Sequence, residues 1–132
     1  MTKREIAYFN AAKAVSSLSD HKYKMGCVIV NKHRIISSGF NSETKCHRIQ
    51  AELDMNEYKM HSSGKVHAET SALLSLRHID LSKASIFIYR ELKDGTKALA
   101  RPCPCCQKLI RKAGIKHVYY TGNNSLIYEE FI

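Results

Sequence analysis

The sequence predicts an α/β fold in which helices pack against a mixed five-stranded sheet. Apolar runs of strand length alternate with segments of helical periodicity along the 132 residues. Two of the expected helices each connect one strand to the next, and such crossover connections place parallel strands in a sheet. The last two expected strands are only about four residues apart, which permits a hairpin and therefore an antiparallel final strand. A chain of this length is expected to form one domain, residues 1–132.

The first third of the chain is expected to form a helix followed by a β-hairpin. Thr2 and Glu5 have the spacing of a capping box, so a helix should begin directly after Thr2 and end near Ser17. Residues 24–30 end in a continuous apolar run, which is typical of a buried strand. After a short polar turn, residues 34–40 should form the return strand.

The middle of the chain is less regular before it becomes helical. Residues 41–65 are polar, and within them residues 50–60 could form a helix. Residues 67–76 carry apolar side chains at helical spacing and predict a second helix. His67 and Glu69 are expected in the first turn of that helix.

The last third of the chain combines three strands with one helix. Pro102 suits the opening of a helix, and Gly114 suits its C-terminal stop. Asp94 and Gly95 should form the turn of the loop that precedes this helix. The expected elements are a strand at 84–90, a helix at 103–113, and strands at 117–121 and 126–132.

The chain carries a large excess of positive charge. It has 21 lysine and arginine residues against 12 aspartate and glutamate residues, for a formal net charge of +9. Such an excess favours an anionic partner such as a nucleotide, a polynucleotide or an acidic surface. No apolar run approaches the length of a transmembrane helix, so no membrane association is expected. The basic N-terminal residues are not followed by the apolar segment of a secretory signal, so we expect an intracellular, cytoplasmic protein.

Two short motifs contain candidate metal ligands. His67 and Glu69 lie two positions apart, and Cys103 and Cys106 form a Cys-x-x-Cys motif with prolines around it. Five cysteines, three of them within four positions, indicate metal binding or catalysis rather than disulfides. One nitrogen and two sulfur ligands leave the fourth position of a tetrahedral zinc ion free for water, as in catalytic sites. Residues two apart on a helix do not share a face, so Glu69 is better placed beside the metal, where it can accept a proton.

These motifs resemble those of the zinc-dependent cytidine and deoxycytidylate deaminase superfamily, whose signature is His-x-Glu followed by Pro-Cys-x-x-Cys. His67-Ala68-Glu69 and Pro102-Cys103-Pro104-Cys105-Cys106 match this signature position by position. Ser38-Gly39-Phe40-Asn41 is similar to the Gly-aromatic-Asn segment of these enzymes, and residues 112–120 are similar to their third helix and fourth strand. The compact size is similar to that of small phage- and virus-borne members.

The resemblance implies a cytidine-deaminase-like three-layer α/β/α sandwich and a hydrolase that deaminates cytosine in a nucleoside or nucleotide. It implies one catalytic zinc ion held by His67, Cys103 and Cys106. Zinc-bound hydroxide would attack C4 of the base, and Glu69 would serve as the proton shuttle.

Three further residues are expected to contact the substrate. The resemblance implies that Asn41 hydrogen-bonds the sugar and that the Ala68 backbone N–H contacts the base. Arg101 flanks the approach to the metal and could contact a phosphate, as could three other basic residues. Those residues are Arg90, Lys93 and Lys97. Because family members are commonly oligomeric, a homo-oligomer is also expected.

Alternatives remain open for the metal. A structural zinc site would need a fourth ligand from Cys27, Cys46 or His47. Cys46 and His47, together with His61, could instead hold a second, structural ion. Cys105 lies off the face of the other two thiols and is expected to pack rather than to bind metal.

Alternatives also remain open for the substrate. His67 as first ligand resembles deoxycytidylate deaminases, whereas the expected C-terminal hairpin resembles cytidine deaminases. A cytosine or adenine in single-stranded DNA or RNA is the alternative substrate, which the positive charge supports and the lack of tryptophan does not. A non-catalytic zinc-binding module that binds nucleotides or nucleic acid is the second alternative, although the intact Glu69 argues against it.

Overall fold

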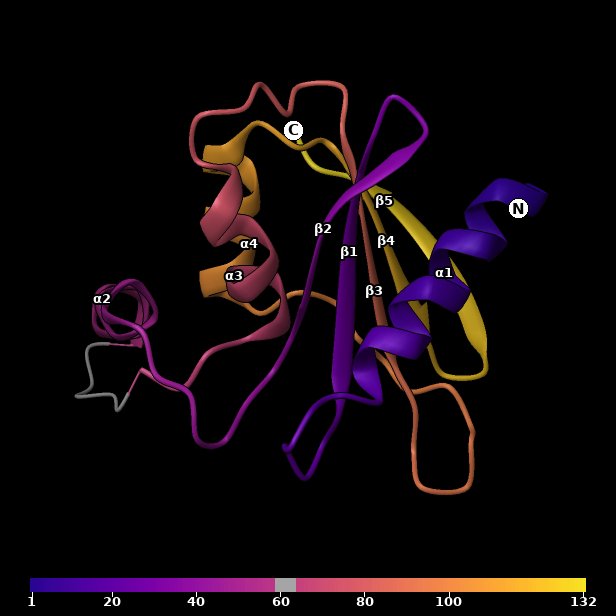
Figure 1. Cartoon of the computed structure of the whole chain (residues 1–132), viewed down its shortest axis with the longest axis horizontal. Helices are drawn as coiled ribbons and strands as arrows, with labels where there is room; N and C mark the ends of the chain where they lie inside the picture. Colours follow the sequence, from indigo (N-terminus) through magenta and orange to yellow (C-terminus); the bar gives the residue numbers. More distant parts are fainter. Residues whose placement is uncertain (59–63) are drawn as a thin grey trace.

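The computed structural model describes residues 1–58 and 64–132. A five-stranded sheet with strand order β2-β1-β3-β4-β5 forms its centre (Figure 1). The strands are β1 (Met25–Asn31), β2 (Arg34–Phe40), β3 (Ser85–Arg90), β4 (His117–Gly122) and β5 (Ser125–Glu130). The helices are α1 (Lys3–Ser16), α2 (Arg48–Tyr58), α3 (Ala68–Leu73) and α4 (Pro104–Ala113), with the 3-10 turn η1 (Leu74–Leu76) after α3.

The strand pairing confirms the mixed sheet and the antiparallel final strand. β1 pairs antiparallel with both β2 and β3, β3 pairs parallel with β4, and β4 pairs antiparallel with β5. β2 and β3 therefore run in the same direction, but β1 lies between them. Only the crossover through α4 produces a parallel ladder, because the crossover through α3 passes over β1.

The helices cover both faces of the sheet, which confirms the three-layer sandwich. α1 lies on one face, and α2, α3 and α4 lie on the other (Figure 1). Each face has its own cluster of buried apolar side chains. Leu73 and Ile110 belong to the cluster under α3 and α4, and Phe9 packs edge-on against Phe87 under α1, with ring centroids 5.2 Å apart. Because β1 and β3 are buried on both faces, their sequences read as continuous apolar runs.

Two helices begin one residue later than predicted, at the positions of the metal-binding motifs. α3 begins at Ala68, and His67 is its N-cap residue with extended backbone angles (φ −81°, ψ 158°). α4 begins at Pro104, and Cys103 is its N-cap residue. Pro104 occupies the first helical position, where a missing N–H costs no helical hydrogen bond, so this proline and not Pro102 opens the helix. Two of the predicted ligands thus precede helices rather than lie within them.

The other predicted boundaries lie close to the observed ones. The helix predicted at 50–60 is α2, which begins at Arg48; residues 59 and 60 lie outside the described residues. The final strand ends at Glu130. The turn predicted at Gly95 is confirmed, since this residue has a φ of 87° and donates a backbone hydrogen bond of 2.9 Å to Leu92. No helix in the described ranges is both long and apolar enough to cross a bilayer.

Gly39 on β2 lies directly under α3, and a side chain there should disturb the site. A Cβ atom on Gly39 would lie 2.5 Å from the Ala68 carbonyl oxygen and 2.5 Å from the Ala72 nitrogen. These are backbone atoms that cannot rotate away, so Gly39→Ala should move α3 away from the sheet and displace His67. We expect the free energy of unfolding to fall by about 1–3 kcal/mol, as measured by chemical denaturation.

The matched control is the exposed neighbour on the same strand. Ser38→Ala should change the free energy of unfolding by less than about 0.5 kcal/mol. If Gly39→Ala were as stable as Ser38→Ala, the close approach of α3 to β2 would not be a constraint on this residue.

Candidate metal centre and active site

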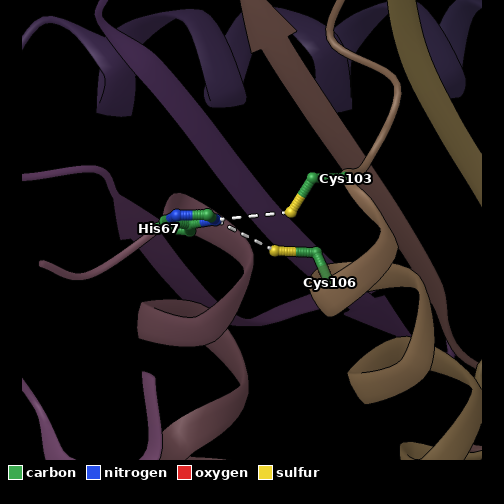
Figure 2. A group of neighbouring side chains, drawn as sticks. All are labelled: His67, Cys103 and Cys106. Atoms are coloured by element: carbon green, nitrogen blue, oxygen red, sulfur yellow. Dashed lines mark hydrogen bonds between the residues drawn. The ribbon is translucent and has the colours of Figure 1, made fainter. Parts of the chain in front are cut away.

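Three side chains at the starts of two helices converge on one point between α3 and α4 (Figure 2). His67 precedes α3, Cys103 precedes α4, and Cys106 lies in the first turn of α4. His67 Nδ1 lies 3.6 Å from Cys103 Sγ and 3.4 Å from Cys106 Sγ. One ligand atom from each of the three residues lies within 4.8 Å of the others. The fold therefore brings together the two motifs that the sequence places far apart.

The spacing of these atoms fits a zinc ion. With a Zn–S distance of about 2.3 Å and a Zn–N distance of about 2.0 Å, tetrahedral geometry separates nitrogen from sulfur by about 3.5 Å. The two observed separations, 3.6 and 3.4 Å, agree with this value. Among the residues that the structure describes, no fourth histidine, cysteine or carboxylate joins the group. Three protein ligands with an open position are the pattern of catalytic rather than structural zinc.

The residues considered as additional ligands lie elsewhere. Cys27 is fully buried in the core of β1, and Cys105 is fully buried within α4. Cys46 is exposed, and the ring of His47 accepts a hydrogen bond of 3.1 Å from the backbone of Ile49. Within the described ranges, Cys46 and His47 belong to no group of three metal donors. His61 lies outside the described residues, so a second ion stays a prediction.

Glu69 is buried beside the three donor residues. It lies in the first turn of α3, and only 3% of its surface is exposed. Burial raises the pKa of Glu69 above the ordinary value of a glutamate, because the charged form loses its hydration. A carboxyl group with a raised pKa is better suited to accept and return a proton near neutral pH.

The two thiols differ in their electrostatics. A hydrogen bond with the Cys106 thiol, aided by the His67 ring, lowers the pKa of Cys103 to about 3. The same thiol–thiol hydrogen bond, together with burial, raises the pKa of Cys106. The hydrogen bond with Cys103 also raises the pKa of His67. Because zinc binds the thiolate form of cysteine, a bound metal ion would displace the thiol protons.

A cleft of about 380 Å³ opens beside the donor residues. Its volume is within the range of small-molecule binding sites. The predicted site residues that line it are Asn41, His67, Ala68, Glu69, Arg101 and Cys103. The cleft therefore joins the candidate metal ligands to the candidate substrate contacts.

Asn41 is buried, and its side-chain amide is hydrogen-bonded within the protein. Its Oδ1 accepts hydrogen bonds from the Met25 backbone N–H (2.9 Å) and the Ser19 hydroxyl (2.7 Å), and its Nδ2 donates to the Tyr23 carbonyl (2.7 Å). These bonds hold the segment before β1 against the end of β2, so Asn41 shapes one wall of the cleft. Its contact with a sugar stays a prediction.

Arg101 forms an ion pair with a residue that sequence reasoning missed. Its Nε and one terminal nitrogen each lie 2.9 Å from an oxygen of Glu129 on β5. The Tyr120 hydroxyl also donates to Glu129, at 2.8 Å. The Arg101 guanidinium, followed by the Tyr120 hydroxyl, holds the pKa of Glu129 below its usual range. A substrate phosphate would have to share Arg101 with this carboxylate.

Comparison with known proteins places the chain among the deaminases. Residues 2–122 match the family described as the cytidine and deoxycytidylate deaminase zinc-binding region. The chain belongs to this deaminase family. It is also 30% identical over 128 residues to the deoxycytidylate deaminase of Mycobacterium phage D29, covering 86% of this chain and 90% of the phage protein. The superfamily resemblance of the motifs is confirmed, and family membership supports a hydrolytic enzyme.

Solved deaminase structures share the fold. The dCMP deaminase of cyanophage S-TIM5 in its apo form matches with a TM-score of 0.64 and 25% identity, over 91% of this chain and 84% of that one. The same cyanophage enzyme has been solved in complex with dCMP and dUMP. A cytidine deaminase from Burkholderia pseudomallei matches with a TM-score of 0.66 over 98% of this chain and 93% of that one, at 19% identity. The fold predicted for the chain is thus that of this deaminase family.

Gln50 is a second residue that sequence reasoning missed. It is fully buried on α2, where its Oε1 accepts hydrogen bonds from the Thr70 hydroxyl (2.6 Å) and the His67 backbone N–H (3.3 Å). Its Nε2 donates to Asp54 at 3.0 Å. Gln50 thereby fixes the backbone of a metal-ligand candidate from a neighbouring helix. Its sequence position within a polar segment carried no signal of this role.

Replacing Gln50 should weaken both the fold and the metal site. Gln50→Met keeps the side-chain size but leaves the Thr70 hydroxyl and the His67 N–H without their acceptor. We expect the free energy of unfolding to fall by about 1–3 kcal/mol, the cost of buried unsatisfied polar groups. Because the His67 backbone loses its anchor, zinc affinity should fall about tenfold, as measured by competition with a chelating dye. Glu52→Ala, at an exposed position on the same helix, is the control and should change neither quantity.

Proposed function

We propose that the protein is a zinc-dependent deaminase that converts the cytosine of a nucleoside or nucleotide to uracil, with deoxycytidylate as the preferred form. One observation carries the proposal. The buried carboxyl of Glu69 lines the same cleft as His67 and Cys103, which belong to the three-residue donor group. A proton carrier, a metal site and a substrate-sized space therefore meet at one place.

The residues of the chain have distinct roles in this reaction. A zinc ion held by His67, Cys103 and Cys106 would supply an activated water molecule when it is bound. Glu69 would accept the proton of that water and return protons to the ring nitrogen and the departing ammonia. The backbone N–H of Ala68, a residue that lines the same cleft, would orient the base.

The relatives favour a free nucleotide as substrate. The phage D29 protein is a deoxycytidylate deaminase, and the cyanophage enzyme is solved with dCMP and dUMP. A cleft of about 380 Å³ is a suitable size for a mononucleotide. Arg90 and Arg101 on the cleft wall are the candidates for its phosphate. A cytoplasmic location and a homo-oligomeric state stay predictions.

A substrate panel tests the proposal. Zinc-loaded protein is incubated with cytidine, deoxycytidine, their monophosphates, single-stranded DNA and RNA, and guanine, and released ammonia is measured. We expect the highest kcat/KM with deoxycytidine monophosphate. If neither nucleosides nor nucleotides released ammonia, the proposal would be wrong.

A further inference from the structure

A second cavity adjoins the active-site cleft and is larger than it. It has a volume of about 690 Å³ and is formed by the end of α1, the loop that leads to β1 and the residues after β3. These three segments lie at the same end of the sheet (Figure 1). Tyr23 and Arg90 line both the cavity and the cleft, so the two spaces meet at these side chains. We call the second cavity the basic groove.

The basic groove is lined by several cationic groups. Their combined positive charge exceeds the negative charge that the phosphate of one nucleotide in the cleft would supply. Among the described residues that line the groove, Glu91 is the one carboxylate; it lies 3.9 Å from Lys13 and accepts a hydrogen bond of 2.7 Å from Tyr89. The other cationic groups that line it are Lys22, Lys24, Arg90 and Lys93. The three lysines of this set are exposed, so their charges are available to a ligand in solution. A surface of this kind attracts a ligand with several phosphates.

The exposed aromatic ring of Tyr23 lies where the groove meets the cleft. Tyr23 is 52% exposed, and two cations lie near its ring: Lys22 Nζ is 5.5 Å and the guanidinium of Arg90 is 5.4 Å from the ring centroid. The ring of His21 is 6.0 Å away. Leu92, another exposed apolar side chain, also lines the groove. Aromatic rings interleaved with cations are the arrangement by which proteins bind the bases and phosphates of single strands.

We propose that the basic groove binds the nucleotides next to the target cytosine in a single-stranded nucleic acid. The inference extends the substrate class and rests on the proposed function, since a cytosine must occupy the adjoining cleft. Arg90 would contact the phosphate that links the two sites, and Tyr23 would stack on the neighbouring base. The triphosphate of a free nucleotide would contact the lysines but would make no use of Tyr23 or Leu92. It would also not require a groove that is larger than the cleft.

Direct binding to a cytosine-free strand tests the groove separately from catalysis. The probe is a fluorescein-labelled thymidine oligonucleotide of about eight nucleotides, which is within the range that one such site covers. Zinc-loaded protein is titrated into it, and fluorescence anisotropy is followed at several salt concentrations. Lys22→Ala/Lys24→Ala/Lys93→Ala should weaken binding at least about tenfold and make the slope of log K against log salt shallower by about 2.

A triple variant with the same charge change is the control. Lys3, Lys83 and Lys116 are exposed and precede or begin α1, β3 and β4, at the end of the sheet opposite the groove. Lys3→Ala/Lys83→Ala/Lys116→Ala should bind the strand within about twofold of the unchanged protein. Equal losses in the two triple variants would overturn the proposal, because net charge alone would then explain the binding.

The role of the ring is tested at Tyr23. Tyr23→Phe keeps the stacking surface and should retain affinity, whereas Tyr23→Ala should lose about tenfold. A duplex of the same length should bind more weakly than the single strand, because its bases are not available for stacking. Equal binding of duplex and single strand would overturn the proposal.

The outcomes separate this inference from the proposed function. Deamination of deoxycytidine monophosphate without strand binding would overturn only the groove. Strand binding without release of ammonia from any cytosine substrate would leave the groove as a nucleic-acid site and overturn the deaminase proposal on which its substrate role depends.

Discussion

Glu69→Gln should abolish deamination while leaving the fold and the zinc content of the protein intact. The amide has nearly the shape of the carboxyl but cannot carry a proton, and general acid–base catalysis contributes about 10²–10⁴-fold in rate. Because the proposed reaction uses Glu69 in more than one proton transfer, the loss in kcat should reach at least the upper part of that range. Burial already disfavours the charged carboxyl, so a neutral amide at this position should not lower the free energy of unfolding.

Three measurements on the same preparation test this expectation. Ammonia release gives kcat, metal analysis gives the zinc content per chain, and thermal unfolding reports on the fold. Glu130→Gln, an exposed carboxylate on β5, is the control and should retain normal kcat. Near-normal turnover by Glu69→Gln would refute the proton-carrier role. Loss of zinc in this variant would instead show that Glu69 holds the metal.

Local sequence signals located the elements that carry the site but missed their first residues. Helical periodicity does not distinguish an N-cap residue from the first helical residue, because the spacing of apolar side chains locates a helix end only to within about one or two residues. Periodicity therefore predicts His67 inside a helix, although its extended backbone makes it the N-cap of α3. The same ambiguity between Pro102 and Pro104 displaced the predicted start of α4 by one residue. The predicted convergence of the two cysteines does not depend on the exact start of the helix, because an N-cap residue and the third residue after it still face the same point.

Contacts between distant segments were beyond the reach of sequence patterns. The pairing of Arg101 with Glu129 joins residues 28 positions apart; it depends on how the loop before α4 lies beside β4 and on the register of β4 and β5. The hydrogen bond from Thr70 to Gln50 spans 20 positions and depends on how α2 packs beside α3. Neither hydrophobic periodicity nor motif spacing contains that information. The sequence predicts which residues carry the chemistry, and the fold was needed to find the residues that hold them in place.

Removal of one thiol ligand should eliminate the stabilisation of the protein by zinc. A metal that binds only the folded state stabilises it by about 2.7 kcal/mol when its free concentration is 100 times Kd. For a chain of this size, that gain should raise the melting temperature by roughly 10 °C. Cys106→Ser keeps a small polar side chain but replaces a soft thiolate with a poor zinc ligand. This variant should lose most of the zinc-dependent rise in melting temperature and should contain little zinc after purification.

The neighbouring cysteine provides the matched control. Cys105 is fully buried one position before Cys106, and its Sγ donates to the Leu53 carbonyl at 3.3 Å rather than facing His67. Cys105→Ala can lower the melting temperature of the metal-free protein through lost packing, but it should keep the full zinc-dependent rise. The comparison uses the difference between melting temperatures with and without zinc, so a general loss of stability does not affect it. If Cys105→Ala lost that difference while Cys106→Ser kept it, the ligand set of His67, Cys103 and Cys106 would be wrong.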